Sequence, residues 1–473
     1  MPISFAIRCF LTCSTVLAIE GCAPVGPNHT PPTMALPASF SRGGVQWNPH
    51  SPEAPSTPQA WWKRYHDGTL TALVERSLAL NQDLAASAAR LRQARELSQA
   101  ARSLYFPDVN FNGRASRSKT RYLGAVDSPR IENNFVVPVD FSYEVDVWGK
   151  NRRKVESAKA TAEAAGESLT ALRLTVAGEV AQTYWALRAV DTDEVALDHT
   201  LEIRRKALDL LTKRRDAGSI SGLDLARAET EVATAEAERI RLEQDRVGLV
   251  NALAVLTGSA ATGFVVPAQA ALPTPPAVPA AVPSDLLRQR PDIRGAERRV
   301  AAANADIGVA TAAFYPSFTI NSNVGLSAGA LSDLFQTSAL VWSIGAEASA
   351  PITRWRLNEA NKQAAIAAHA AASADYRQTV LESIREVENA LQGAAILERR
   401  QVAQDQALAA ATKTFDLSVK RYQSGLVSFL DVVDAERTRL DTERAANGIR
   451  AERLAVSVSL IKALGGEGQD SKH

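Results

Sequence analysis

The sequence lacks an excess of charge of either sign, since 53 lysines and arginines face 52 aspartates and glutamates. A near-neutral chain gives no indication of a nucleic-acid partner or of an anionic binding surface. It also lacks the motifs of metalloproteases, phosphate-binding loops, nucleophile elbows and dinucleotide folds, and its six histidines are scattered. We therefore predict that the protein is not an enzyme, with no catalytic residue, no cofactor and no metal site.

Cysteine is also scarce, and all three copies lie within the first 22 residues. An apolar run over residues 10–19 follows Arg8 and is too short to cross about 30 Å of hydrocarbon, so we predict an export signal over residues 1–21. The end of this segment resembles a bacterial lipoprotein cleavage box, and cleavage would make Cys22 the acylated N-terminus, with no second cysteine for a disulfide. The alternative, an apolar first helix of a cytosolic protein, is disfavoured by the proline-rich residues that follow.

Proline is missing from residues 150–266 and again from residue 352 to the C-terminus. These stretches match each other, because residues 209–258 lie over residues 416–465 at a constant offset of 207. A second match, at offset 209, places Tyr-Phe-Pro at 105–107 over Phe-Tyr-Pro at 314–316. Shared helical composition would not bring a proline and two aromatics into register. We therefore predict two tandem copies of one unit of about 200 residues.

The proline-free stretches show continuous helical patterning. Apolar residues at coiled-coil spacing predict helices over residues 150–215 and 356–422, each about 100 Å long at 1.5 Å per residue. Each meets a glycine, Gly218 or Gly425, which suits the left-handed residue that closes a helix. Shorter helices are predicted to return over residues 222–256 and 428–464, and one more precedes Pro107 over residues 69–104.

Alternating apolar and polar residues predict two strands in each repeat. They lie over residues 109–115, 135–147, 318–326 and 342–350. Polar loops over residues 116–134 and 327–338 are predicted to join the members of each pair. One face of each strand is apolar and the other carries acidic or amide side chains, which is typical of a half-buried sheet and also of an outer-membrane barrel.

Four strands cannot close a membrane barrel, since the smallest barrels have about eight, and an open edge is not stable in lipid. We therefore predict that more than one chain shares the barrel. Because long helices follow directly after strands, they would extend the tube away from the membrane.

With these features the chain resembles the outer membrane factor (TolC-like) family of Gram-negative export systems, and most closely its lipoprotein branch of OprM- and NodT-like efflux components. The resemblance is carried by GCAPVGP at the predicted cleavage site, the duplicated strand pairs and the turns RRDAGSISGLD and RYQSGLVSFLDVVDAER. It implies a mainly α fold with a small β part. Each chain would add a long coiled-coil segment to a helical barrel and four strands to a shared twelve-stranded outer-membrane β-barrel, in two tandem repeats.

The resemblance also implies partners and a location. The protein would be a homotrimer in the lipid of the cell outer membrane, lipid-anchored at Cys22 and extending into the periplasm. It would work with a periplasmic adaptor protein and an inner-membrane efflux pump, and with no nucleic acid. The implied segments are a signal peptide 1–21, an extended equatorial strap 22–68, a first repeat 69–266, a proline-rich connector 267–283, a second repeat 284–465 and a C-terminal tail 466–473.

Matched position by position, the two turns carry the implied functional residues. The tips that contact the adaptor match Gly218, Ser221, Gly425 and Ser428. The periplasmic gate matches Asp224, Tyr422, Asp431 and Asp434. Val427 stands where TolC has an arginine that bonds to the other hairpin, so the closing network must differ here, and Arg214 or Arg421 would take its place. The residues alone leave a second role open for the last two aspartates, which could cap the helix start and compensate its dipole.

The leading hypothesis is therefore a passive exit duct of a tripartite efflux system, gated at its periplasmic tip. One alternative is the outer-membrane component of a type I protein secretion system. Another, from a different class, is a periplasmic coiled-coil scaffold lipoprotein without a pore. The scaffold accounts for the helices and the anchor but gives the four amphipathic strands no purpose.

Overall fold

The computed structural model describes residues 23–34, 39–41, 60–121, 129–270, 272–276, 281–283 and 289–465. The chain divides into two compact units. The first is built from the N-terminal residues up to Thr33, Arg90–Gly166 and Gly295–Arg377, and the second from Met34–Ala89, Glu167–Arg294 and Gln378–His473. Within the described ranges, none of the helices offers an apolar stretch of the length that a membrane crossing requires.

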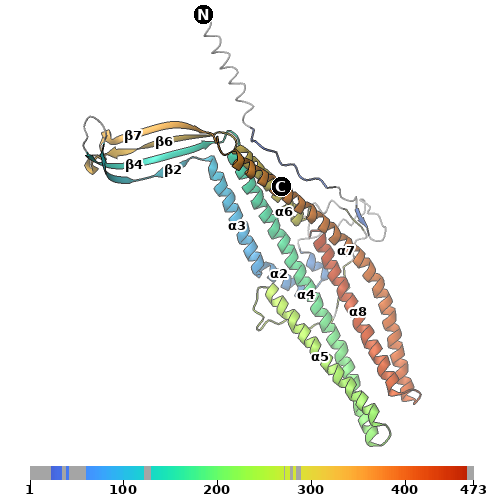
Figure 1. Cartoon of the computed structure of the whole chain (residues 1–473). Helices are drawn as coiled ribbons and strands as arrows, with labels where there is room; N and C mark the ends of the chain where they lie inside the picture. Colours follow the sequence, from blue (N-terminus) through green and yellow to red (C-terminus); the bar gives the residue numbers. More distant parts are fainter. Residues whose placement is uncertain are drawn as a thin grey trace. The chain divides into compact units, whose positions relative to one another are not determined.

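The long helices form where the sequence predicts them (Figure 1). They are α4 (Lys150–Asp216) and α7 (Trp355–Gln423), of 67 and 69 residues, and the shorter α5 (Gly222–Leu256) and α8 (Phe429–Ala463) follow them. Each end lies within one residue of its predicted position. No proline interrupts these stretches and a glycine follows each long helix, so local causes account for the extent of the long helices.

The first unit holds one antiparallel sheet (Figure 1). Its strands follow one another in the order β2 (Asp108–Phe111), β4 (Pro129–Val145), β6 (Ser317–Ala328) and β7 (Leu340–Ser349). β3 (Arg114–Arg121) also pairs with β4 and continues the line of β2 after an interruption at Asn112 and Gly113. The prediction of four strand positions is therefore confirmed, with the first position split in two.

The prediction of a polar loop over residues 116–134 is wrong for its described part. β3 and β4 pair through this region, from Arg114 opposite Val136 to Arg121 opposite Pro129. Both strands are polar here, so the sequence shows no alternation, although backbone pairing requires none. Residues 122–128 lie outside the described residues. The second predicted loop, after β6, contains the short 3₁₀ helices η4 (Leu331–Asp333) and η5 (Thr337–Ala339).

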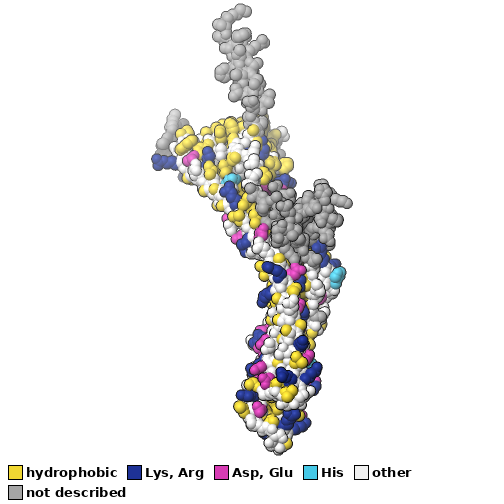
Figure 2. All heavy atoms as spheres, turned by 90° about the vertical axis from the view of Figure 1, so that its right-hand side faces the viewer, with side chains coloured by type: hydrophobic (Ala, Val, Ile, Leu, Met, Phe, Trp, Pro, Cys, Tyr) yellow, Lys and Arg dark blue, Asp and Glu magenta, His cyan; other side chains and the backbone are white. Residues whose placement is uncertain are grey.

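The register of the sheet places apolar side chains beside apolar ones. Val324 of β6 stands between Val139 and Trp342, while Asn323 stands between Asp140 and Ser343. A slip of one residue would exchange the two faces. The apolar face is uncovered in the single chain, where Trp342 is 72% exposed, and Figure 2 shows hydrophobic side chains gathered over the strands. An apolar surface of this kind marks a site of contact with lipid or protein.

Residues 23–33 lie against α6 (Pro291–Ala312) and the first turns of α4. The backbone N–H of Val25 donates to the carbonyl of Trp148 (3.0 Å), and the side chain of Asn304 donates to the carbonyl of Pro27 (2.9 Å). Gly26 has φ +89°, and a Cβ there would lie 2.6 Å from Cα of Gly308. These contacts hold residues 25–27 of the expected strap in place. Residues 1–21 and the predicted lipid anchor Cys22 lie outside the described residues.

The prediction of one helix over residues 69–104 is wrong at Asn81, which is extended (ψ 129°) between α2 (Gly68–Leu80) and α3 (Gln82–Arg102). Oδ1 of Asn81 accepts hydrogen bonds from the backbone N–H groups of Asp83 (2.9 Å) and Leu84 (3.1 Å), which caps α3. Its amide donates to the carbonyl of Leu256 (3.0 Å), the last residue of α5. One buried asparagine thus serves two helix ends, which favours the break.

The second repeat closes its return helix with a different side chain at the corresponding place. Arg290, at offset 209 from Asn81, donates from Nη1 to the carbonyl of Ala463 (2.7 Å). Ala463 ends α8 and lies at offset 207 from Leu256, the residue bonded by Asn81. The two repeats therefore share the position of this bond but not its chemistry, and the α8 carbonyl receives the stronger, charge-assisted donor.

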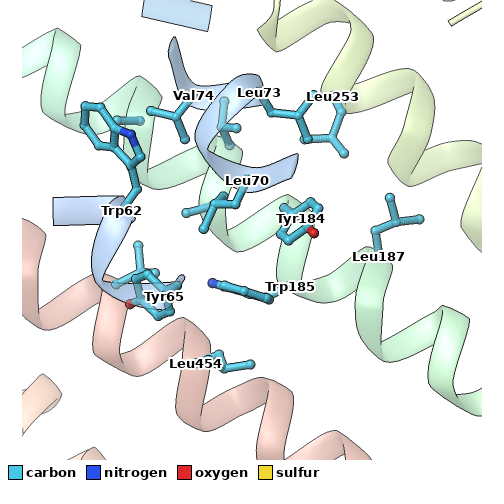
Figure 3. Close-up of a cluster of buried hydrophobic side chains, with 14 of the residues drawn as sticks. Trp62, Tyr65, Leu70, Leu73, Val74, Tyr184, Trp185, Leu187, Leu253 and Leu454 are labelled. Carbon is cyan, nitrogen blue, oxygen red and sulfur yellow. The ribbon is translucent and has the colours of Figure 1, made fainter. Parts of the chain in front are cut away.

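The core of the second unit gathers aromatic side chains around a short 3₁₀ helix, η1 (Trp61–Tyr65) (Figure 3). Tyr65 packs 5.3 Å from Trp185 of α4, and its hydroxyl lies 2.6 Å from Oγ of Ser457 in α8. Burial raises the pKa of Tyr65 to about 12. The expectation of an extended strap over residues 22–68 is therefore wrong for residues 61–65, because three large aromatics bury more area as a compact turn.

Two further sets of contacts hold the connector in place, one from the strap range and one from α4 and α5. β1 (Ser39–Ser41) pairs with β5 (Ala281–Pro283), which sequence analysis did not predict. Asp191 of α4 is 1% exposed and accepts hydrogen bonds from Nη1 of Arg188 (2.6 Å), Nε of Arg246 (2.8 Å) and the backbone N–H of Gln269 (3.1 Å). Arg188 also donates to the carbonyl of Pro267, the first connector residue, and Arg246 to that of Val266 just before it. The buried carboxylate of Asp191 and its two arginines thus hold residues 266–269 in place.

Candidate functional site at the two helix turns

The turn between α4 and α5 is closed by glycine and capped by serine. Gly218 has φ +72°, and its backbone N–H donates to the carbonyl of Arg215 (2.8 Å), while that of Ser219 donates to the carbonyl of Arg214 (2.8 Å). Ser221 then precedes α5, and its Oγ accepts from the N–H of Leu223 (3.1 Å). The paired backbone bonds and the left-handed glycine form a Schellman turn.

The turn between α7 and α8 repeats these bonds at offset 207. Gly425 has φ +74° and donates from its N–H to the carbonyl of Tyr422 (3.0 Å), and Leu426 donates to the carbonyl of Arg421 (2.9 Å). Ser428 precedes α8. A Cβ on either turn glycine would meet nothing within 4 Å. Both turns lie at the same end of the second unit (Figure 1), and the four predicted tip residues are exposed there.

The predicted gate carboxylates have different local roles in the single chain. Asp431 accepts at Oδ2 from both the hydroxyl (2.6 Å) and the backbone N–H (2.8 Å) of Ser428, and these bonds hold its pKa below the usual value. It therefore does cap the start of α8, the second role that the sequence left open. Asp434, one turn later, is exposed, and Asp224 lies 4.0 Å from Arg227 on its own helix.

A hydrogen bond joins the two hairpins close to their turns. Nη1 of Arg214 in α4 donates to the hydroxyl of Tyr422 in α7 (3.1 Å), and the guanidinium carbon lies 5.7 Å from the ring centroid. The ring of Tyr422 in turn packs 5.8 Å from Phe429 of α8. Of the two arginines proposed to replace the residue missing at Val427, the structure brings Arg214 to Tyr422.

A buried ion-pair network further along the same helices was missed by sequence analysis. Arg204 of α4 pairs with Glu231 of α5 (3.1 Å) and with Glu436 of α8 (2.8 Å), and Arg437 also pairs with Glu231. Glu436 follows Val432 by four residues and Val433 by three, so the spacing on the apolar stripe could have indicated a buried charge. Arg204, Glu231 and Glu436 join the hairpins through charges that are nearly inaccessible to solvent, where a broken pair is costly.

Comparison with known proteins agrees with this architecture. Residues 73–259 and 282–466 match the outer membrane efflux protein family. The chain is 32% identical to the pyoverdine export outer membrane protein OpmQ of Pseudomonas aeruginosa over 87% of this chain and 88% of that protein. It is 30% identical to the solvent efflux pump outer membrane protein SrpC of Pseudomonas putida over 95% and 96% of the two chains, and 30% identical to Nodulation protein T of Rhizobium leguminosarum bv. trifolii over 89% of each.

Solved structures give the same result. The outer-membrane channel OprN aligns with a TM-score of 0.87 at 31% identity, covering 93% of this chain and 99% of that one. CusC aligns with a TM-score of 0.83 at 26% identity, covering 94% and 100%. These neighbours are TolC-like channels, which confirms the predicted fold class of a helical tunnel with a β-barrel. Because the family's matches span most of the chain and the named relatives cover nearly all of it, this chain belongs to the outer membrane efflux protein family, whose members are channels and not enzymes.

Proposed function

We propose that this chain forms the exit duct of a tripartite efflux system, as a passive homotrimer anchored in the outer membrane by a lipid on Cys22. The periplasmic adaptor docks on the tip residues Gly218, Ser221, Gly425 and Ser428, and an inner-membrane pump works behind it. The tunnel is gated at this end by Asp224, Tyr422, Asp431 and Asp434, together with the Arg214 bond to Tyr422.

The unclosed sheet of the first unit carries this proposal. Within the described residues, β7 pairs on one side only, as does the line formed by β2 and β3. Unpaired backbone groups cost several kcal/mol each in hydrocarbon, so these edges need partners. Three copies placed edge to edge give twelve strands. Their exposed apolar faces then meet lipid, and the face of Asp140 and Asn321 lines the lumen.

The named relatives favour efflux over protein secretion. OpmQ is named for pyoverdine export and SrpC for solvent efflux, so the cargo in each name is a small molecule. The proposed adaptor and pump follow from the same likeness. The buried link between the hairpins and the bond from Arg214 to Tyr422 would hold the proposed gate in one arrangement until the adaptor displaces the turns.

The gate proposal predicts that Asp431→Asn with Asp434→Asn lowers the cation selectivity of the channel several-fold in planar bilayers, because carboxylates converging from three chains raise the local cation concentration. Asparagine can still accept the cap bond from Ser428, so α8 should keep its start. Asp441→Asn, an exposed carboxylate further along α8, is the matched control. Wild-type selectivity and wild-type block by trivalent cations in the double variant would refute the gate assignment. Absence of conductance both in wild type and in Tyr422→Phe, which lacks the bond from Arg214, would refute the duct itself.

The anchor proposal predicts that Cys22→Ser abolishes labelling by radioactive palmitate, since no other cysteine remains after signal cleavage. The variant should still assemble in the membrane, because the strands and not the lipid supply the larger apolar surface. Labelling that persists in the variant would contradict the lipoprotein assignment but would leave the duct proposal unaffected.

A further inference from the structure

A cavity of about 170 Å³ lies between the two hairpins, above the turns. The helices α4, α5, α7 and α8 all contribute to its wall. The apolar part is formed by Ile203, Ala207, Ala228, Phe415, Val419, Tyr422, Phe429, Val432 and Val433. An apolar cavity of this size accepts a benzene-sized group. The cavity lies wholly within the second unit and is separate from the exposed carboxylates of the proposed gate.

The charged residues in the wall are Arg204, Glu231 and Glu436, which together carry one negative charge. Arg437 contacts Glu231 from outside the wall, so the charges of these four residues balance. A preference for a cationic guest must therefore come from an individual group in the wall and not from a surplus of charge.

Glu436 supplies the group that would recognise such a guest. Its side chain is 5% exposed, and Oε2 is bonded by Arg204 (2.9 Å). Oε1 is buried and has no hydrogen-bond partner within the protein. A buried carboxylate oxygen left without a donor is destabilising, and an ammonium N–H is a strong donor for it.

We propose that this cavity binds a small organic cation with an aromatic body. The ammonium group donates to Oε1 of Glu436, and the aromatic body packs among Phe415, Tyr422 and Phe429. A bound cation would contact α4 and α5 of one hairpin and α7 and α8 of the other, so it would hold the hairpins together. Binding requires neither transport nor an adaptor, so its failure and the failure of the duct proposal are distinguishable.

Calorimetric titration of the purified full chain in detergent tests the proposal, with benzylammonium as the cation and benzyl alcohol as its neutral counterpart. Wild type should bind benzylammonium about tenfold tighter or better than benzyl alcohol. Glu436→Gln should weaken benzylammonium binding by about the same factor. Glu229→Gln is the matched control, because Glu229 is the exposed counterpart of Glu436 in the first repeat and should leave binding unchanged.

A second variant covers the case in which Glu436→Gln does not assemble. Ala207→Leu keeps every charge but fills part of the cavity, so it should abolish binding of both compounds while the protein stays folded. The proposal is overturned if wild type binds neither compound, if it binds both equally, or if benzylammonium binding persists in Ala207→Leu or at full strength in Glu436→Gln.

Discussion

Asp191→Ala is expected to lower the free energy of unfolding by about 3–5 kcal/mol, because it removes one partner of a buried ion pair and leaves the other uncompensated. Arg188 is 1% exposed and cannot turn to solvent when its carboxylate is gone. Arg246 and the backbone N–H of Gln269 lose an acceptor at the same time. The substitution should therefore destabilise the connector as well as α4.

Urea unfolding of the purified protein, followed by circular dichroism, measures this change. Asp209→Ala is the matched control, since Asp209 on the same helix pairs with Lys213 at 2.6 Å but is 64% exposed. An exposed pair contributes at most about 1 kcal/mol, so this variant should stay close to wild type. Protease should also cut residues 267–276 faster in Asp191→Ala. A loss no larger than that of the control would show that the buried network does not anchor the connector.

Gly258→Ala is expected to destabilise the protein by about 2–5 kcal/mol through two effects that add. Gly258 closes α5 with φ +66°, a conformation that penalises any Cβ. A Cβ there would also lie 2.2 Å from the carbonyl oxygen of Leu80, so backbone at the end of α2 must move. That end carries the bond from Asn81 to α5, so the junction should loosen as a whole.

Gly218→Ala separates the two effects. Gly218 closes α4 with φ +72°, but its Cβ would meet nothing within 4 Å. The free energy of unfolding of this variant should fall only by the conformational cost of a left-handed alanine, about 1–2 kcal/mol. Unfolding of both variants under the same conditions tests the difference. If Gly258→Ala and Gly218→Ala lower the free energy of unfolding equally, then α2 moves aside without cost and its close approach to α5 contributes little to stability.

Sequence patterns predicted the candidate site only in part. Gly218 and Gly425 could be assigned to helix-closing turns because a positive φ is a local demand, and the structure has both in that conformation. Their role in adaptor contact stays a prediction. Arg204 and Glu436 were not singled out, since each resembles an ordinary charge on a helix until its neighbours from the other hairpin are known. The same holds for the cavity between them.

The failures of secondary-structure prediction also have physical causes. Periodicity continues through Asn81, but this side chain caps α3 and bonds to the end of α5, so a distant helix end favours the break. β3 and its partner stretch of β4 lack apolar alternation, yet their backbones pair for eight residues. In both places a long-range partner outweighs the local pattern.

The sequence by itself determined the elements whose causes are local: the duplication, the ends of the long helices, the glycine turns and the alternating strands. Helical periodicity, the absence of proline and the conformation of glycine depend on residues close in sequence, so they can be recognised without knowing the tertiary structure. Only the tertiary structure decided which charges are buried together, as Asp191 with Arg188 and Arg204 with Glu436 are. It alone also showed that residues 61–65 enter the core. These outcomes depend on which distant segments meet, because burial away from water determines how much an ion pair or an aromatic cluster contributes to stability.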